Sequence, residues 1–288
     1  MSSGRIICAD NLDVLATLED GSVQLIYIDP PFNTGKVQEL RAVRTVADPN
    51  GERIGFGDRR YRAEELGRLA YDDRHEDYLG FLEPRLREAH RVLGEEGTLY
   101  VHIDPRESHY VKVMLDGIFG RDCFLNEIVW AYDFGGRSKR RWPAKHDVIL
   151  AYVRDPRRYH FDSAEVDREP YMAPGLVGAE KAARGKLPTD VWWHTIVPTN
   201  GSERTGYPSQ KPEGIVHRIV TASSRPGDLC LDFFAGSGTL GAVARGLGRD
   251  FLLVDSNPDA IAVMERRLGM RAERSARQAG QMEIGFGG

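Results

Sequence analysis

A proline-containing loop follows the apolar run at residues 25–28. Residues 29–33 read Asp-Pro-Pro-Phe-Asn, and two successive prolines hold φ near about −65°, so the loop presents its acceptors in preset directions. The carboxylate of Asp29 and the carbonyl of Pro30, which precedes Pro31, could accept both hydrogens of a conjugated exocyclic amine and the departing proton. Phe32 could stack against a base taken out of a nucleic-acid helix. A rigid strand exit with a core phenylalanine explains the same residues without chemistry.

A glycine turn near the other end of the chain suits a nucleoside-bearing cofactor. Residues 231–239 read Leu-Asp-Phe-Phe-Ala-Gly-Ser-Gly-Thr, which predicts a strand, a turn at Gly236 and Gly238, and a helix. Asp255 ends the next strand candidate, where it could accept hydrogen bonds from ribose hydroxyls. Residues 236–241 also match the Gly-x-Gly-x-x-Gly fingerprint, so a nicotinamide dehydrogenase is an alternative. The late position of the turn and the Asp-Pro-Pro-Phe loop count against that alternative.

The elements that must position these residues alternate between short apolar runs and helix-period segments, which predicts an α/β fold. The expected strands are Arg5–Ala9, Val23–Ile28, Thr98–Ile103, Glu127–Tyr132, Asp147–Val153, Leu229–Phe233 and Phe251–Val254. Apolar residues at helical spacing between 79 and 93 predict an amphipathic helix. Further helices are expected at Glu213–Ser223, Leu240–Leu247 and Pro258–Leu268, the last with Asn257 as its N-cap. Residues 36–76 and 156–208 break the rhythm and are expected to be long irregular segments.

Charge and composition indicate which kinds of partner the chain could bind. The chain has a net charge of −4, yet residues 135–160 contain eight basic and two acidic residues, with aromatic residues interleaved. Because local charge attracts phosphates, this window favours contact with nucleic acid, and a solvated face remains the alternative. The three cysteines, Cys8, Cys123 and Cys230, are widely spaced, which argues against disulfides and a zinc site. Cys8 and Cys230 lie in apolar strand-like runs and are expected to be buried thiols. Without a long apolar stretch or a signal sequence, the chain is expected in the cytoplasm and away from membranes.

Taken together, the motifs resemble those of DNA amino-methyltransferases of the β arrangement, in which the catalytic loop precedes the cofactor turn. The resemblance covers most of residues 4–268. It includes Ile-Cys-Ala-Asp-Asn at 7–11, Asp-Pro-Pro-Phe at 29–32, Lys-His-Asp-Val-Ile-Leu at 145–150, Ser-Gln-Lys-Pro at 209–212, and the turn at 232–239. The Gln-Lys-Pro run has no place in a dehydrogenase, so the resemblance argues against nicotinamide binding.

The resemblance implies a doubly wound, mainly parallel, seven-stranded sheet. Its catalytic domain would comprise residues 1–155 and 206–288, with a target-recognition insertion at 156–205. The implied reaction transfers a methyl group from S-adenosylmethionine to adenine N6 in double-stranded DNA, with base flipping and no metal. A homodimer and a cognate restriction endonuclease are further partners that the resemblance implies.

Site roles are carried over by position. The catalytic residues would be Asp29, Pro30, Pro31 and Phe32. The cofactor-binding residues would be Asp10, Ser209, Lys211, Asp232, Phe234, Ala235, Gly236, Gly238, Thr239 and Asp255. The DNA-binding residues would be Arg137, Lys139, Arg140, Arg141 and Lys145. The chain departs from the family at Phe32, Ser209 and Phe233, where Tyr, Thr and Pro are commoner, and Asp255 replaces the usual Glu.

Three alternatives stay open. Cytosine N4 is also a conjugated exocyclic amine, and the acceptors at Asp29 and Pro30 could serve it as well. An acidic first residue in the loop is typical of adenine enzymes, which favours adenine. A protein-amide methyltransferase would carry Asn-Pro-Pro-Tyr instead, and a catalytically silent DNA-binding relative would not need the acidic residues and glycines that this chain retains.

Overall fold

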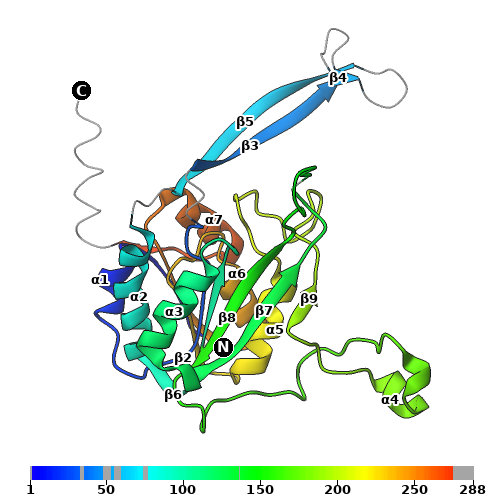
Figure 1. Cartoon of the computed structure of the whole chain (residues 1–288). Coiled ribbons are helices and arrows are strands. Elements are labelled where there is room, and N and C mark those ends of the chain that lie inside the picture. The colour runs from blue at the N-terminus through cyan, green and yellow to red at the C-terminus, as the bar shows by residue number, and fades with distance from the viewer. Residues whose placement is uncertain are drawn as a thin grey trace.

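The computed structural model describes residues 2–32, 36–47, 53–54, 60–73, 77–135 and 137–274. A nine-stranded sheet runs through it in the order β12-β1-β11-β10-β2-β6-β8-β7-β9 (Figure 1). The strands from β12 to β6 are parallel, β8 is antiparallel to both β6 and β7, and β9 is parallel to β7. Their bounds are β1 Gly4–Cys8, β2 Val23–Ile28, β6 Leu93–Ile103, β7 Phe124–Ala131, β8 His146–Val153, β9 Val191–Trp193, β10 Leu229–Asp232, β11 Asp250–Asp255 and β12 Glu273–Arg274.

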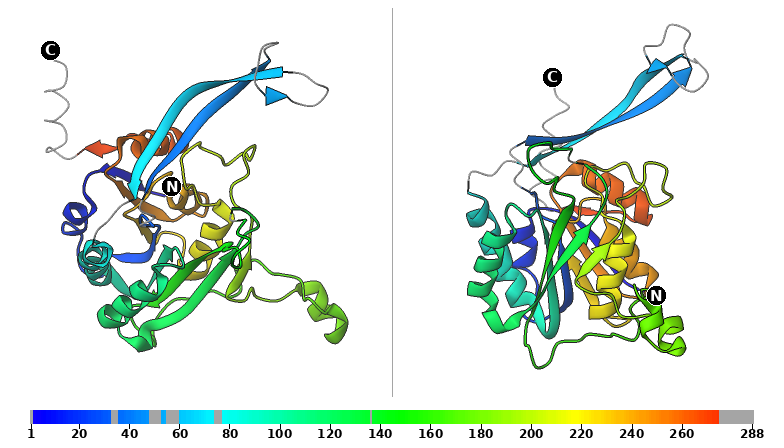
Figure 2. Two further views of the ribbon diagram at one scale, coloured as in Figure 1. Left: turned by 45° about the horizontal axis from the view of Figure 1, so that its top comes forward. Right: turned by 45° about the vertical axis from the view of Figure 1, so that its right-hand side comes forward.

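Helices cover both faces of this sheet, as Figure 2 shows, so the doubly wound α/β prediction is confirmed. One face packs against α1 Asn11–Leu15, α2 Tyr78–Val92 and α3 Ser108–Phe119. The other packs against α5 Glu213–Ser223, α6 Thr239–Gly246 and α7 Pro258–Leu268. Strand β2 is buried on both sides, which is why it reads as a continuous apolar run.

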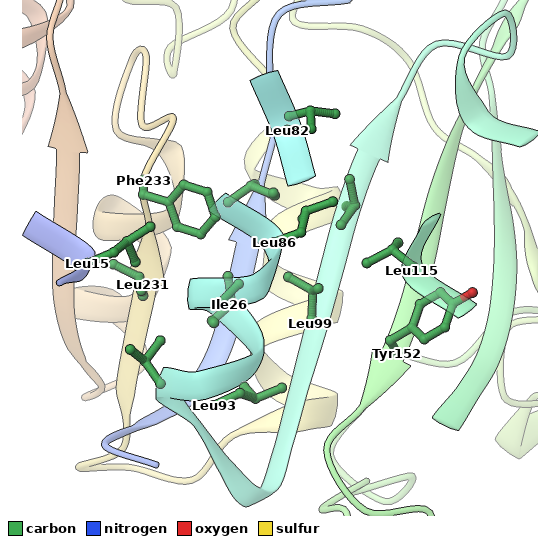
Figure 3. Close-up of a cluster of buried hydrophobic side chains, with 14 of the residues drawn as sticks. Leu15, Ile26, Leu82, Leu86, Leu93, Leu99, Leu115, Tyr152, Leu231 and Phe233 are labelled. Carbon is green, nitrogen blue, oxygen red and sulfur yellow. The ribbon is translucent and has the colours of Figure 1, made fainter. Parts of the chain in front are cut away.

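Alternate residues of β2 serve the two cores. Ile26 faces the core under α2, where Leu82 and Leu86 are fully buried against it (Figure 3). Leu25 and Tyr27 face the core under α5 and α6. Each fully buried aliphatic side chain stabilises the fold by about 1.5–3 kcal/mol, so the two cores hold β2 and its loop firmly in place.

The predicted helix ends agree with the structure. Asn257 accepts a hydrogen bond from the backbone N–H of Asp259, and Pro258 occupies the first turn of α7. Helices α2, α5 and α6 also form where the sequence predicts them, within about one residue at each end.

Several elements were not predicted. Besides the seven expected strands, the short strands β9 and β12 extend the two edges of the sheet, so its described part has nine strands. Helix α3 was missed, although Val111, Leu115 and Phe119 recur at a spacing of four and are buried.

The prediction that residues 36–76 are irregular was wrong for the part that the structure describes. Strands β3 Lys36–Ala47 and β5 Arg60–Asp73 form a long antiparallel ribbon that projects from the body, and β4 Arg53–Ile54 adds to it (Figure 1). Pairing between distant segments of mixed polar composition gives no clear apolar period, so the sequence pattern did not reveal it. The remaining residues of 36–76 lie outside the described ranges.

Residues 156–208, which were expected to be irregular, contain more structure than expected. They include a 3-10 turn at Pro174–Leu176, helix α4 Ala179–Arg184 and strand β9. Because β8 ends beside the start of β6, the chain leaves β8 at the end of the sheet where the parallel strands begin. It returns through β9 to the opposite end of the sheet, where the parallel strands finish. Helix α4 lies away from the body, on the side opposite the β3–β5 ribbon (Figure 1).

Two smaller expectations concern the cysteines and the membrane. Cys8 and Cys230 are buried free thiols, as predicted, and Cys123 is a buried free thiol as well. Among the described residues, no helix has both the length and the apolar character needed to span a bilayer.

Candidate active site

Four neighbouring parallel strands each place an aspartate at the same end of the sheet, where the carboxyl ends of the strands lie. Strand β10 pairs with β2 on one side and β11 on the other, and β11 pairs with β1. The carboxyl ends of these strands carry Asp10, Asp29, Asp232 and Asp255, which all line one cavity of about 490 Å³. Ligands of open α/β sheets bind at this edge, so the topology alone marks the cavity as the site.

The cavity brings together most of the predicted residues. All of the proposed catalytic residues, Asp29, Pro30, Pro31 and Phe32, line it. So do the proposed cofactor residues Asp10, Ser209, Lys211, Asp232, Phe234, Ala235, Gly236, Thr239 and Asp255. Gly238 does not line the cavity and instead lies at the start of α6.

Asp29 is paired through one oxygen only. Lys211 donates a hydrogen bond of 2.5 Å to Asp29 Oδ2, and the exposed fractions of the two side chains are 8% for Lys211 and 17% for Asp29. The other oxygen, Oδ1, is buried and has no hydrogen-bond partner among the described residues. A buried carboxylate oxygen without a donor is costly, so the hydrogen bonding of Asp29 is left incomplete.

Phe32 lies beside this ion pair. The Lys211 ammonium is 4.6 Å from the centroid of the Phe32 ring, which is a cation–π distance. The ring of Phe32 is partly exposed and lines the cavity. The ammonium of Lys211 therefore contacts both the carboxylate and the aromatic ring of the Asp-Pro-Pro-Phe loop.

The segment before α5 holds Lys211 in place. Gln210 accepts hydrogen bonds from both the backbone and the hydroxyl of Thr205, and it donates one to the carbonyl of Glu203. The carbonyl of Lys211 accepts a hydrogen bond of 3.2 Å from the hydroxyl of Thr239 on α6. Pro212 then occupies the N-cap position of α5. Each residue of the Gln-Lys-Pro run thus has a separate structural task.

The glycine turn has the backbone geometry that glycine favours. Gly236 and Gly238 have φ values of 49° and 72°, in the left-handed region. A Cβ on Gly238 would also lie 2.8 Å from Cγ of Met264. Asp232 Oδ1 accepts from the N–H of Phe234, and Asp255 accepts from the N–H groups of Gly236 and Asn257. Two of the acidic residues therefore fix the turn as well as lining the cavity.

Burial sets the charge of these two carboxyls. It raises the pKa of Asp232 well above its usual range, and the charges of Asp29 and Asp255 raise it further. Burial also raises the pKa of Asp255, although hydrogen bonds from Asn257 and Gly236 oppose the effect. A cationic ligand would lower both pKa values, because it favours the ionised carboxylates.

Asp10 lies at the far end of the cavity and has two structural partners. It caps α1 by accepting from the N–H of Leu12, and it lies 3.5 Å from the guanidinium of Arg85. Arg85 is buried, donates to Asn11 Oδ1 at 2.7 Å and lies 4.0 Å from the ring of Phe81. Sequence reasoning missed Arg85 and Phe81, which both line the cavity. The available signal was an arginine beside Leu86 on the buried face of α2.

The predicted DNA-binding residues lie outside the cavity, in the loop that joins β7 to β8. This loop is at the same edge of the sheet as the cavity, because β8 begins beside the end of β6. Arg137, Lys139, Arg140 and Arg141 are exposed, and none forms an ion pair within the described structure. Lys145 differs, because it pairs with Asp133 at 2.7 Å. Trp142, which is 94% exposed, lies among the unpaired cations.

Comparison with known proteins agrees with this geometry. Residues 23–266 match the family described as DNA methylase, N6_N4_Mtase. Type II methyltransferase M.HpaI of Haemophilus parainfluenzae is 30% identical over 92% of this chain and 74% of its own length. DNA adenine methyltransferase YhdJ of Escherichia coli is 29% identical over 96% of this chain and 87% of its own.

Solved structures share the fold. The PvuII DNA methyltransferase, described as cytosine-N4-specific, superposes with a TM-score of 0.64 at 16% identity, over 99% of this chain and 92% of that chain. The M1.HpyAVI–SAM complex gives a TM-score of 0.59 at 18% identity, over 93% and 100%. The family match extends over most of the chain and includes both the Asp-Pro-Pro-Phe loop and the glycine turn. The chain therefore belongs to the N6_N4_Mtase family of DNA methylases and is a DNA methyltransferase that uses S-adenosylmethionine.

Proposed function

We propose that this methyltransferase modifies the N6 amino group of adenine in double-stranded DNA. The observation that carries the proposal is the buried, unpartnered Oδ1 of Asp29, beside the partly exposed ring of Phe32. A carboxylate is a stronger acceptor than the hydroxyl of a Ser-Pro-Pro loop. The similarity to YhdJ, whose name specifies adenine, supports the same choice.

Each loop residue has a role in this proposal. Lys211 occupies Asp29 Oδ2, so Oδ1 is the oxygen that remains to accept one hydrogen of the target amine. The carbonyl of Pro30 accepts the second hydrogen, and Pro31 keeps the loop in that orientation. Phe32 stacks on the base after it leaves the helix. Withdrawing both hydrogens concentrates electron density on the nitrogen, which makes it a better nucleophile.

The cofactor fits the remaining part of the cavity. S-adenosylmethionine supplies an electrophilic methyl group on a sulfonium. We assign its ribose to Asp255, its adenine to the Asp10 end, and its methionine part to Asp232, Phe234, Ala235, Gly236 and Thr239, with Ser209 and Lys211 beside it. Gly238 shapes the turn from outside the cavity lining. The acidic lining suits a ligand with a net positive charge.

The choice of base has a direct test. Unmethylated DNA is incubated with the enzyme and digested to nucleosides, whose masses are measured. We expect N6-methyladenine. N4-methylcytosine alone would overturn the choice of base. The similarity to the PvuII enzyme, at 16% identity, does not favour cytosine.

Asp29→Ala should lower turnover by about 100-fold or more while S-adenosylmethionine affinity changes little.

DNA recognition is proposed for the loops around the cavity. The exposed residues Arg137, Lys139, Arg140 and Arg141 would bind phosphates, and Lys145 would contribute less because Asp133 already neutralises it. The sequence predicts a target-recognition insertion at 156–205, between catalytic segments at 1–155 and 206–288. We narrow it to residues 194–205, because these follow β9 at the cavity edge whereas α4 does not. Chimeras that exchange residues 194–205 with a relative should change the methylated sequence.

Two partners are proposed from family resemblance. A second copy of the chain would form a homodimer, which light scattering would detect. A cognate restriction endonuclease would cut the same sequence that this enzyme protects. DNA methylated by the enzyme should then resist an endonuclease of that specificity.

A further inference from the structure

Four hydrogen-bonded side chains lie behind Phe32 and take no part in the proposed methyl transfer itself. They are Tyr27 on β2, His102 on β6, Tyr132 directly after β7, and Asp147 on β8. His102 is fully buried, with Nδ1 2.9 Å from the Tyr27 hydroxyl and Nε2 3.2 Å from Asp147 Oδ2. Tyr132 donates to Asp147 Oδ1 at 3.0 Å. We call these four residues the Asp147 network.

Strand register explains how residues so distant in sequence meet. Tyr27 lies opposite Tyr100, so His102 is its diagonal neighbour on the same face of the sheet. His102 lies opposite Ile149, which makes Asp147 the diagonal neighbour on its other side. Diagonal pairs are within reach of long side chains, so the pleat alone aligns the network.

The charge of Asp147 fixes the direction of the hydrogen bonds that it accepts. Burial acting alone would raise the pKa of Asp147, but the hydrogen bond from His102 and the charge of Lys211 hold that pKa below its usual range. An ionised carboxylate only accepts, so His102 Nε2 carries a hydrogen and donates it. Burial raises the pKa of Tyr27 well above its usual range, so its hydroxyl keeps its proton at hydrogen-bond distance from Nδ1 of His102.

The network contacts the proposed catalytic loop at one end. The ring centroids of His102 and Phe32 are 6.1 Å apart, and Trp130 packs edge-on against His102 at 5.4 Å. Tyr27 also lines the cavity. Because His102 is held by both nitrogens, its ring gives Phe32 a fixed surface on the side away from solvent.

At the other end, the network holds the base of the basic loop. Tyr132 is the first residue after β7, and its N–H donates to the carbonyl of Lys145 at 3.0 Å. Asp147 accepts from Tyr132 on one oxygen and from His102 on the other. The exposed cations at residues 137–141 therefore lie in a loop whose base is bound to Asp147 through Tyr132. The same carboxylate binds His102, which packs against Phe32.

We propose that the Asp147 network positions the flipped base, by fixing Phe32 and the base of the β7–β8 loop relative to each other. Asp147, His102 and Tyr132 are positioning residues that act through Phe32. The proposal rests on the proposed function, since it assumes that a base stacks on Phe32. A purely structural role is a poor explanation of the carboxylate, because residues 148–153 of β8 are buried and almost entirely apolar, and a buried charge adds little net stability.

The experiment compares three variants on the intact enzyme. Asp147→Asn keeps the shape, but its amide oxygen can accept from only one of the two donors. Tyr132→Phe removes one hydroxyl and nothing else. Tyr152→Phe is the matched control, because the Tyr152 hydroxyl also donates to a half-buried aspartate, Asp116 at 2.7 Å, on the α3 side of the sheet.

Two measurements separate positioning from stability. The methylated sequence is first identified by sequencing DNA from an expression host, and a duplex is then made with 2-aminopurine at the target base. Loss of position should lower kcat and the rise in 2-aminopurine emission by about 10- to 100-fold in Asp147→Asn, and by less in Tyr132→Phe. The KM for S-adenosylmethionine should stay within twofold of wild type. Tyr152→Phe should lower the Tm with kcat unchanged.

The outcomes are distinct. If Tyr132→Phe and Asp147→Asn keep wild-type kcat and emission and lose only Tm, the network is structural and the proposal is overturned. If Asp147→Asn does not fold, Tyr132→Phe still decides, because it keeps the ring and the charge. Failure of the adenine assignment would appear in the wild-type enzyme as N4-methylcytosine. The variants would then be compared on that base.

Discussion

Replacing Lys211 tests whether the Asp29–Lys211 pair is the central feature of the site. Lys211→Met removes the ammonium and keeps most of the apolar stem, which leaves a largely buried carboxylate without its cation. Breaking one side of a buried pair costs about 3–5 kcal/mol. Since 17% of the Asp29 side chain remains exposed, we expect the lower end, a loss of about 3 kcal/mol in the free energy of unfolding.

The chain contains a closely matched control for this change. Lys112 pairs with Asp116 at 2.8 Å and lies 4.7 Å from the ring of Phe124, which repeats the Lys–Asp–Phe arrangement of the site. Lys112 is more exposed, and Asp116 keeps the hydroxyl of Tyr152 as a donor. Lys112→Met should therefore cost less than Lys211→Met, because Asp116 keeps both the Tyr152 hydroxyl and a second cation, Arg121 at 3.6 Å.

The assay is urea unfolding followed by tryptophan fluorescence, applied as a double-mutant cycle. The variants are Lys211→Met, Asp29→Asn and their combination. The combination removes both charges, so it should lose less than the sum of the single changes, by about 1.5 kcal/mol or more. Additivity within about 0.5 kcal/mol would refute the pairing and the argument that Lys211 directs Oδ1 toward the amine.

Three further outcomes are expected. Gly238→Ala should destabilise the protein by about 1–3 kcal/mol in thermal unfolding, because its φ is 72° and a Cβ would meet Met264; an unchanged Tm would contradict this. S-adenosylmethionine affinity, measured by calorimetry, should rise with pH, because burial raises the pKa of Asp232 and only its ionised form attracts the cation. Asp232→Asn should flatten this pH dependence. A pH dependence as steep as in wild type would show that Asp232 is not its source. The dependence of DNA affinity on salt concentration should weaken when Arg137, Lys139, Arg140 and Arg141 are all changed to Ala, with the log–log slope falling by about 0.9 for each phosphate no longer bound. Lys145→Ala should change this slope less, because Asp133 already neutralises Lys145. An unchanged slope in the quadruple variant would make these residues a solvated face.

The sequence predicted the parts of the fold that local patterns determine. Buried strands such as β2 read as apolar runs, and helix α7 carries its own cap and first-turn proline. The loop at Asp29 and the turn at Gly236 follow such strands directly, so both could be placed at strand ends from the sequence alone. The structure joins them because β2 and β10 are adjacent in the sheet.

What could not be predicted depends on contacts between distant residues. Asp29 and Lys211 are 182 positions apart, and their ion pair forms only once α5, which follows Lys211, is packed against β2. Arg85 was missed because an arginine on an apolar helix face reads as an exception until Asn11 and Asp10 are placed beside it. Lys145 was grouped with the other cations because no sequence pattern shows that Asp133 neutralises it.

The distribution of charge in this molecule follows its two ligands. The described lining of the cavity contains four aspartates and two cations, Lys211 and Arg85, which suits a sulfonium cofactor. The exposed loop at 137–141 is basic and unpaired within the described structure, which suits a polyanion. The same acidic lining would repel a phosphate, so a strand that binds the loop can send only an uncharged base into the cavity. A net charge of −4 is therefore compatible with DNA binding, because the acidic and basic groups are assigned to different ligands.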